Sequence, residues 1–541
     1  MKPKTTTKTA VALIALTAFL AACETSTEET TASSATAAVS PSAGLYIDIL
    51  NGALGHPLSG LRLPSEPLDR ERYQHLEENP VKLVAEAPVS TFSVDVDTGS
   101  YSNVRRLLDA GRMPPGDAVR IEEMVNYFDY AYPGPEDRQQ PFAVSTEVAR
   151  TPWNPDTHLL RIGIKGFDIE LSERPPANLV FLVDVSGSMD SPDKLPLVIR
   201  SLKLLTQKLT VKDRISLVVY AGAAWAVLEP TPGDERAEIR AALERLRAGG
   251  STAGEGGIRL AYDFAEKAWI EGGINRVILA TDGDFNVGVA DVEALKDLIA
   301  RKRKTGITLT VLGFGTGNYH EALMERIADV GNGNYAYIDR LAEARKVLVR
   351  EMSSTLFTIA KDVKVQVEFN PAVVGEYRLI GFENRLLARE DFRNDKVDAG
   401  DIGAGHTVTA LYEIALVGGP GLRIDPLRYQ ARVAPAYDPR ASEFALLKLR
   451  YKLPDRDQSR LIETPLERRL LEEAGRRPSA DFRFAAAVSA FGQILRDGSY
   501  TRDFGYDEVR ALAREAKGED RFGYRAGFLE LVDLAQDLDP S

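Results

Sequence analysis

The sequence predicts an α/β fold in which a doubly wound, mainly parallel sheet is flanked by a β-sandwich and followed by a C-terminal helical segment. In the middle of the chain, five strand-like apolar runs alternate with amphipathic helical stretches, which indicates βα units. These runs are rich in Val, Ile and Leu throughout, as expected when both faces of a strand are covered. On either side, short extended segments predominate, and the last part of the chain returns to helical spacing.

Length and composition limit the possible classes of protein. A chain of 541 residues is too long for one hydrophobic core, and roughly three to four folding units are expected. The 44% hydrophobic and 27% charged residues are ordinary for a folded soluble protein. The 67 basic and 79 acidic residues give a net charge of −12. Such a chain repels phosphate backbones, so nucleic-acid binding is not expected.

The first 22 residues have the pattern of a targeting segment. Three lysines precede an apolar run that is too short to span a bilayer and that ends in Leu-Ala-Ala-Cys23. This ending resembles the lipobox of bacterial lipoproteins, in which the peptide is cleaved before the cysteine and the thiol carries a lipid. The resemblance implies an envelope protein anchored to a membrane through Cys23, and Glu24 favours the outer membrane, on its periplasmic or surface face. Because Cys23 is the only cysteine, no disulfide can form within the chain.

The rest of the chain divides by composition. Residues 23–45 form a Ser/Thr/Ala-rich disordered tether with almost nothing to bury, and the segment after it cannot be assigned to a unit. An N-terminal β-rich domain, the central α/β domain, a second β-rich domain and a helical C-terminal region are expected at 90–170, 172–352, 360–453 and 454–541. The strands of the first β-rich domain are candidates for the same β-sandwich as those of the second. Helical spacing in the central domain falls at 193–209, 234–247, 255–271, 291–304 and 319–330.

Hydroxyl and carboxylate side chains occur where three pieces of the central domain reach one edge of its sheet. Asp184, Ser186 and Ser188 follow the first strand, Thr252 lies in a Gly-rich loop, and Asp282 ends another buried strand. In open α/β sheets, ligands bind at this carboxyl edge of the strands. Oxygen ligands without sulfur or imidazole suit a hard cation such as Mg²⁺ or Mn²⁺. Because only two of the five groups are carboxylates, the bound metal would keep enough charge to attract an acidic oxygen from a partner.

This order of motifs resembles the metal-ion-dependent adhesion site of von Willebrand factor type A domains, and residues 172–352 are identified as such a domain. In that family the two serines and the threonine contact the metal, and the two aspartates often act through water. The resemblance implies that these five residues bind Mg²⁺ or Mn²⁺. The alternative is that the aspartates cap helices and the serines satisfy backbone donors. That alternative explains each of the three motifs alone, but not why all three are expected at the same edge of the sheet.

A wider resemblance covers most of the chain. The segments FSVDVDTGSYSNVRR and DAVRIEEMVNYFDYAYP precede the A domain, and β-rich and helical parts follow it. This arrangement is similar to a group of bacterial lipoproteins with a central A domain and flanking domains of unknown role. The resemblance implies an architecture and leaves the biological role open.

Other signals favour structural roles. Asp97, Thr98 and Ser100 are expected to serve in a turn and a helix cap. The five histidines are scattered without the spacing of metal ligands. The three tryptophans are expected in core or half-buried positions, at Trp153, Trp225 and Trp269. No nucleophile–base pair can be identified, so the protein is not expected to be an enzyme.

The expected function is therefore that of a membrane-anchored protein that binds a protein partner through a divalent metal bridging to a carboxylate of the partner. The alternative is a structural or scaffold module of an envelope complex, in which the metal only orders the loops. Partner binding that survives chelation of the metal would favour the alternative. The partner cannot be read from this chain, because the acidic residue that completes the site lies on the other molecule.

Overall fold

The computed structural model describes residues 71–539 apart from 72, 171, 253, 284–288, 318–319 and 426–441. The chain divides into two units, Met1–Pro67 and Leu68–Ser541, and all described residues belong to the second. The predicted targeting segment, Cys23 and the tether therefore lie outside the described residues. Among the described helices, none is both long and apolar enough to cross a membrane.

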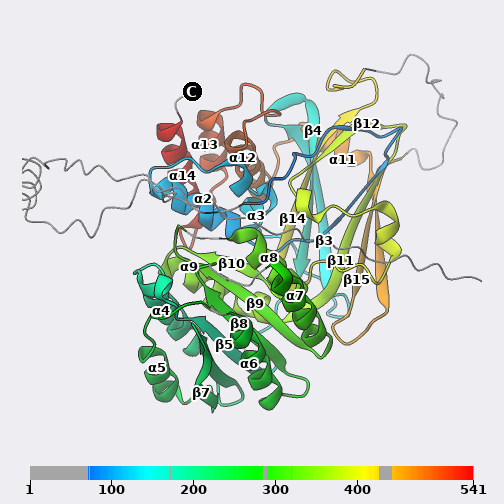
Figure 1. Cartoon of the computed structure of the whole chain (residues 1–541). Coiled ribbons are helices and arrows are strands. Elements are labelled where there is room, and N and C mark those ends of the chain that lie inside the picture. The colour runs from blue at the N-terminus through cyan, green and yellow to red at the C-terminus, as the bar shows by residue number, and fades with distance from the viewer. Residues whose placement is uncertain are drawn as a thin grey trace, which may run out of the picture. The chain divides into compact units, whose positions relative to one another are not determined.

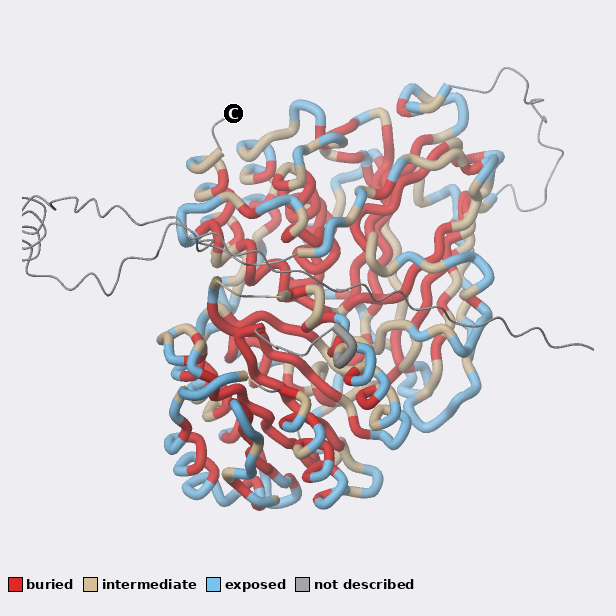
Figure 2. Tube along the Cα trace, in the orientation of Figure 1, coloured by how far each residue is buried: buried red, intermediate tan, exposed pale blue. Residues whose placement is uncertain are grey.

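The central domain is built on a six-stranded sheet of order β10-β9-β8-β5-β6-β7 (Figure 1). All neighbouring strands are parallel except β7, which runs antiparallel to β6 at the edge. Every residue of the central strand β5 is buried (Figure 2), which explains its unbroken apolar sequence. The strands are β5 (Ala177–Asp184), β6 (Arg214–Tyr220), β7 (Ala224–Pro232), β8 (Ile274–Thr281), β9 (Ile307–Phe314) and β10 (Tyr335–Ile338).

Helices cover both faces of this sheet, as a doubly wound fold requires. One face packs against α4, α5 and α9, and the other packs against α6, α7 and α8. The predicted α/β class is thus confirmed, and the five expected helices appear as α4 to α8 at or close to their expected positions, whereas α9 and α10 were not expected. The helices are α4 (Leu195–Thr206), α5 (Arg236–Glu244), α6 (Gly254–Lys267), α7 (Val289–Lys304), α8 (Glu321–Val330), α9 (Leu341–Arg345) and α10 (Met352–Leu356).

Two antiparallel sheets flank the central domain and share one hydrophobic core. One sheet has the order β1-β12-β14-β4-β3, and in the other β11 pairs with β2, β13 and β15, which pairs with β16. Strands from before the A domain pair with strands from after it, because β4 pairs with β14 and β2 with β11. The segments expected as two β-rich domains therefore form one unit of two packed sheets, which we name the flanking body. The strands are β1 (Lys82–Leu83), β2 (Val89–Ser93), β3 (Phe142–Thr151), β4 (Asn154–Gly166), β11 (Thr358–Phe369), β12 (Val374–Ile380), β13 (Ile402–Gly403), β14 (Thr407–Leu416), β15 (Glu443–Lys452) and β16 (Ser459–Glu467).

The C-terminal helices pack against two helices that precede the A domain, and they share a second core (Figure 1). The longest of them begins at a serine cap, because the Ser479 hydroxyl accepts a hydrogen bond from the Phe482 amide at 3.1 Å. The N-terminal and C-terminal parts of the described chain are therefore interleaved in helices as well as in sheets. The helices are α2 (Gly99–Asp109), α3 (Ile121–Asn126), α12 (Ala480–Leu495), α13 (Tyr506–Glu515) and α14 (Tyr524–Leu538).

The chain passes between the flanking body and the A domain twice, and we call these two passages the chain crossings. One loop forms hydrogen bonds to both of them. We name residues 403–406, which connect β13 to β14, the junction loop. The Gly405 amide donates to the Phe167 carbonyl at 2.8 Å, on the segment that leads into the A domain. The Ala404 amide donates to the Phe357 carbonyl at 2.8 Å, on the segment that leads out of it. The A domain is thus an insertion whose two ends meet at the same place.

Candidate functional site

Asp184 connects the loops that follow two neighbouring strands at the carboxyl edge of the sheet. Its Oδ1 accepts a hydrogen bond from the Ser186 amide at 2.8 Å, and its Oδ2 accepts one from the Thr281 hydroxyl at 3.2 Å. The side chain is fully buried, and this burial raises the pKa of the carboxyl to about 6. Asp184 therefore links the serine loop to the end of the neighbouring strand β8.

The serine loop and the Gly-rich loop are held together by their backbones. The Oγ atoms of Ser186 and Ser188 lie 3.0 Å apart. The Gly187 amide donates to the Gly250 carbonyl at 3.0 Å, and the Gly249 amide donates to the Val185 carbonyl at 2.8 Å. Gly250 has a φ of +88°, which favours glycine at this close approach. Thr252 is half-buried and lies two residues after Gly250 in the same loop.

Asp282 has a cationic partner that the sequence reasoning missed. Its carboxylate is buried and pairs with the Lys194 ammonium at 2.9 Å. Lys194 immediately precedes α4, and no local pattern shows that its side chain turns toward a loop 88 residues further along the chain. The Lys194 ammonium offsets the charge of one of the two carboxylates. The five predicted ligands would therefore neutralise less of the charge of a bound metal than the sequence suggests.

The donor set fits a hard divalent cation. The Ser186 and Ser188 hydroxyls lie 3.0 Å apart, with Ser186 buried and Ser188 half-buried. The buried Asp184 carboxylate accepts a hydrogen bond from the Ser186 amide, and a second carboxylate, that of Asp282, pairs with Lys194. Mg²⁺ and Mn²⁺ accept such oxygen ligands and usually keep several water molecules. Asp184, Ser186, Ser188, Thr252 and Asp282 are the residues that would hold the metal, which would supply an electrophilic centre for an acidic group.

The two sides of this edge differ in how far they are covered. On the β9–β10 side, the Gly317 amide donates to Glu71 at 3.1 Å. The Tyr337 hydroxyl donates to the Gly315 carbonyl at 2.5 Å, and the Arg106 guanidinium lies 5.6 Å from the Tyr337 ring centroid. On the β6–β7 side, the hairpin residues Gly222 and Ala223 are exposed. Among the described residues, access to the metal edge is therefore more open from the β7 side.

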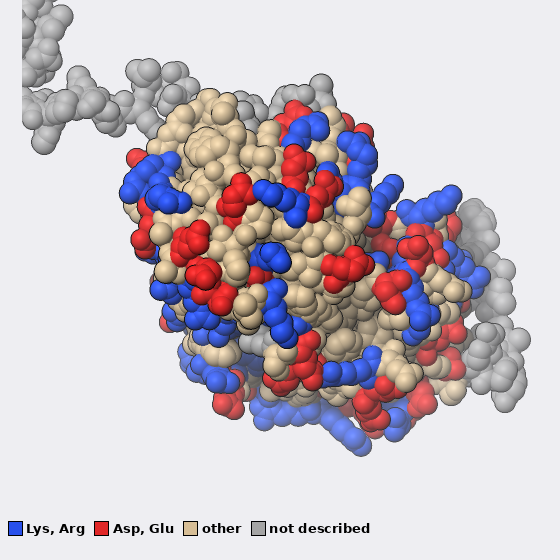
Figure 3. Space-filling model, turned by 90° about the horizontal axis from the view of Figure 1, so that it is seen from below, with Lys and Arg blue, Asp and Glu red and all other residues tan. Residues whose placement is uncertain are grey.

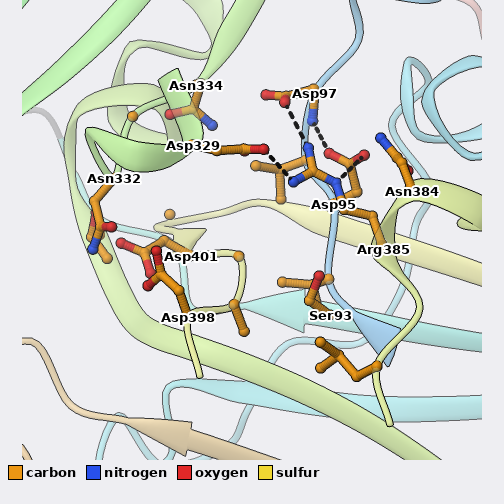
Figure 4. A pocket seen from close by; sticks show the side chains of 18 of the residues that line it. Ser93, Asp95, Asp97, Asp329, Asn332, Asn334, Asn384, Arg385, Asp398 and Asp401 are labelled. Atoms are coloured by element: carbon orange, nitrogen blue, oxygen red, sulfur yellow. Dashed lines mark hydrogen bonds and ion pairs between the residues drawn. The ribbon is translucent and has the colours of Figure 1, made fainter. Parts of the chain in front are cut away.

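A second polar cluster lies where the A domain meets the flanking body, beside a cavity of about 220 Å³. Figure 4 shows Arg385 pointing into a group of carboxylates. Its guanidinium pairs with Asp95 at 3.0 Å, Asp97 at 3.2 Å, Glu325 at 3.2 Å and Asp329 at 2.7 Å. Two of these carboxylates belong to α8 of the A domain and two follow β2, so the cluster ties the two parts together.

Three carboxylates of this cluster, Asp95, Glu123 and Glu325, lie close enough to suggest a cation site. Their oxygens are already engaged, however. Arg385 pairs with Asp95 and Glu325, and Arg120 pairs with Glu325 at 2.7 Å and with Glu123 at 3.3 Å. The two guanidinium groups take the place that a metal would need, so this cluster fits a buried salt-bridge network better than a metal site.

The buried network holds more carboxylates than cations. Burial raises the pKa of Glu122 to about 8, that of Glu321 to about 7 and that of Asp329 to about 6. The remaining negative charge is therefore relieved by protonation at mildly acidic pH. No local sequence pattern predicts this network, because its members come from four separate segments of the chain.

Two predictions about individual residues are wrong. Thr98 stands at the N-cap of α2 but makes no side-chain cap hydrogen bond, and Asp97 pairs with Arg385 and accepts a hydrogen bond from the Tyr335 amide at 2.9 Å. Trp153 is buried as expected, whereas Trp225 and Trp269 are exposed, at 47% and 41% of their surface. Trp225 lies on an edge strand, which a local sequence pattern cannot distinguish from a central one.

Comparison with known proteins defines the class. The family model "von Willebrand factor type A domain" matches residues 178–350, and the model "von Willebrand factor" matches residues 67–161. The chain is therefore a protein with a von Willebrand factor type A domain, a class that generally mediates protein interactions and often binds a divalent metal. The model "Uncharacterized protein YfbK, C-terminal" matches residues 354–538.

Similarity over most of the chain shows the family. The Escherichia coli K12 protein "Uncharacterized protein YfbK" is 50% identical over 473 residues, which cover 86% of this chain and 81% of that protein. The chain belongs to the YfbK family. The Synechocystis protein "Uncharacterized protein sll0103" is 33% identical over 187 residues, 34% of this chain and 43% of that protein. The solved structure "von Willebrand factor type A from Catenulispora acidiphila" is 17% identical, with a TM-score of 0.40, and covers 73% of this chain and 89% of its own.

Proposed function

We propose that this protein binds a protein partner through a divalent metal, Mg²⁺ or Mn²⁺, that bridges to a carboxylate of the partner. The metal is held by Asp184, Ser186, Ser188, Thr252 and Asp282. The observation that carries the proposal is the joining of the ligand-bearing loops: the Gly187 amide donates to the Gly250 carbonyl at 3.0 Å, and the Asp184 carboxylate accepts hydrogen bonds from the Ser186 amide and the Thr281 hydroxyl. Because Lys194 offsets the charge of Asp282 at 2.9 Å, a divalent ion there would keep charge for an acidic ligand from outside.

The scaffold alternative, in which the metal only orders the loops, is less well supported. The serine loop and the Gly-rich loop are already tied by two backbone hydrogen bonds of 3.0 and 2.8 Å. A metal is therefore not needed to bring them together. No catalytic role is proposed, because the edge offers no general base beside the metal ligands among the described residues. The lipid anchor at Cys23 and an outer-membrane location belong to this proposal as predictions of the sequence.

The test is partner capture from an envelope extract with the full chain purified in detergent, with Mg²⁺ or with EDTA. We expect a partner that is held with Mg²⁺ and lost with EDTA or with Asp184→Ala. The matched control is Asp190→Ala, because Asp190 is an exposed carboxylate on the turn just after the serines, and it should bind like the wild type. Equal capture with Mg²⁺ and EDTA would favour the scaffold alternative.

A further inference from the structure

A lysine ammonium contacts one of the proposed metal ligands. Lys194 immediately precedes α4, and its Nζ lies 2.9 Å from Oδ2 of Asp282. Both groups are buried, because 9% of the Lys194 side chain is exposed and none of the Asp282 side chain. Charges that are shielded from water interact more strongly than charges at the surface. The charge of Lys194 therefore acts directly on one of the five residues assigned to the metal.

The loop after β9 packs against the Lys194 side chain. A Cβ built on Gly315 would lie 2.3 Å from Cγ of Lys194 and 2.4 Å from its Cε. Only a glycine allows the loop to lie this close to the lysine, and the φ of +76° at Gly315 favours glycine as well. The residue types on both sides of this contact therefore fit the lysine in its observed position.

Two further contacts fix that loop. The Tyr337 hydroxyl donates to the Gly315 carbonyl at 2.5 Å, and the Gly317 amide donates to Glu71 at 3.1 Å. Glu71 in turn pairs with Arg106 at 2.7 Å. Because the loop is held on both sides of its contact with Lys194, the fold keeps the ammonium beside Asp282.

The charge balance of the site depends on this ammonium. Asp184 and Asp282 are the two carboxylates of the proposed ligand set, and Lys194 offsets one of them. A divalent ion would then leave one positive charge uncompensated at a largely buried position, which costs free energy. One carboxylate from a partner would compensate it. Without Lys194, the two carboxylates alone would neutralise the ion.

Surface charge does not supply the same preference on the face that Figure 3 shows. Basic and acidic side chains are interspersed there, and neither sign dominates. Attraction between that face and an acidic partner is therefore weak at physiological salt. The preference for an acidic ligand is assigned instead to the charge of Lys194 inside the site.

We propose that Lys194 makes metal binding at this edge conditional on an acidic ligand. Through its ion pair with Asp282, it weakens the binding of Mg²⁺ or Mn²⁺ alone and favours the metal together with a carboxylate of the partner. Metal and partner then bind cooperatively, and each raises the affinity for the other by the same factor. Lys194 is thus a specificity-determining residue that acts through a metal ligand. This inference rests on the proposed metal bridge.

The test is the affinity of the full chain for Mn²⁺, measured by titration calorimetry without acetate and with acetate at constant ionic strength. Acetate takes the place of the partner carboxylate, and the affinity is corrected for the metal that acetate itself binds. Acetate should raise the affinity of the wild type about five-fold or more. Lys194→Met keeps an apolar side chain without the charge, so it should bind Mn²⁺ alone about ten-fold more tightly than the wild type. Acetate should then have little effect on the variant.

The matched control is Lys203→Met, because Lys203 lies on α4 and pairs with the exposed Glu244 instead of a metal ligand. It should behave like the wild type in both titrations. Lys194→Gln is the second variant if Lys194→Met does not fold, because its amide can still donate a hydrogen bond without carrying charge. Structural damage to the loops would weaken metal binding, so a gain in affinity distinguishes the proposed role from a merely structural one.

The outcomes separate this inference from the proposed function. If the Lys194 variants bind Mn²⁺ no more tightly than the wild type, or if acetate strengthens the binding equally in both, the role of Lys194 is refuted and the metal bridge stands. Absence of any acetate effect on the wild type refutes it as well. If the wild type binds no Mn²⁺ under either condition, or if Asp184→Ala binds it equally, the metal site itself fails.

Discussion

Replacing Arg385 with alanine would leave three buried carboxylates and the partly exposed Asp329 facing one another. The guanidinium lies 2.7–3.2 Å from Asp95, Asp97, Glu325 and Asp329, and the Arg385 side chain is only 11% exposed. Removing one partner of a buried ion pair costs about 3–5 kcal/mol, because the remaining charge stays desolvated. We expect Arg385→Ala to lower the free energy of unfolding by about this amount at pH 8.

The loss should be smaller in mild acid. Burial already raises the pKa of Asp329 to about 6 and that of Asp97 above its ordinary value, and loss of the arginine raises both further. A carboxyl whose pKa is higher in the folded than in the unfolded state binds more protons when folded. Stability therefore falls as the pH rises from the unfolded pKa to the folded one. The deficit of Arg385→Ala should grow between pH 5.5 and pH 8.

Urea denaturation followed by circular dichroism at pH 5.5 and pH 8 measures both effects. The control is Arg138→Ala, because the Arg138–Glu173 pair is exposed, at 62% and 50% of the two side chains. Such a pair contributes about 0–1 kcal/mol. A loss below about 1 kcal/mol for Arg385→Ala, or an equal loss at both pH values, would refute the description of this network.

Three further predictions concern the metal, the buried acids and the packing of the A domain. Millimolar Mg²⁺ should raise the Tm of the wild type in thermal unfolding, and an equal rise in Asp184→Ala would contradict the assigned ligands. Burial raises the pKa of Glu122 from 4.5 to about 8, so the wild type loses stability as the pH rises through this window. Glu122→Gln lacks this titration, and its stability relative to the wild type should increase up to about pH 8; denaturation profiles that run parallel with pH would argue against it. A Cβ at Gly333 would lie 1.8 Å from the Leu309 carbonyl oxygen, whereas one at Gly134 meets nothing within 4 Å. Gly333→Ala should therefore cost about 1–3 kcal/mol in urea denaturation and Gly134→Ala little, and equal stabilities would show that the backbone there can shift freely.

The parts of the fold that could be predicted are those whose signal is local. The strands of the central sheet are continuous apolar runs because both faces are covered, and their helices carry one apolar stripe each. The loops with Asp184, Thr252 and Asp282 could be placed together in advance, because strands of a parallel sheet end at one edge. In the structure, backbone hydrogen bonds join the serine loop to the Gly-rich loop, and Asp184 accepts a hydrogen bond from Thr281, the residue before Asp282.

The parts that could not be predicted depend on distant pairs. Lys194 meets a carboxylate 88 residues away, and Arg385 meets one 290 residues away. The pairing of β4 with β14 likewise joins strands from opposite sides of the A domain. Nothing near either member of such a pair identifies the other, so the buried network could not be inferred. A shared β-sandwich could be named as a candidate, but not which of its strands pair. The exposure of Trp225 is a similar case, because it follows from the position of its strand at the edge.

The junction loop affects how a load on the A domain is carried. Both chain crossings bond to residues 403–406, through Phe167 and Phe357, and the Arg385 salt bridges join the same two parts beside a cavity that Gly403 also lines. Tension applied at the metal edge therefore reaches the flanking body through main-chain hydrogen bonds and side-chain salt bridges together. If the salt bridges break first, more of the load passes to the two crossings.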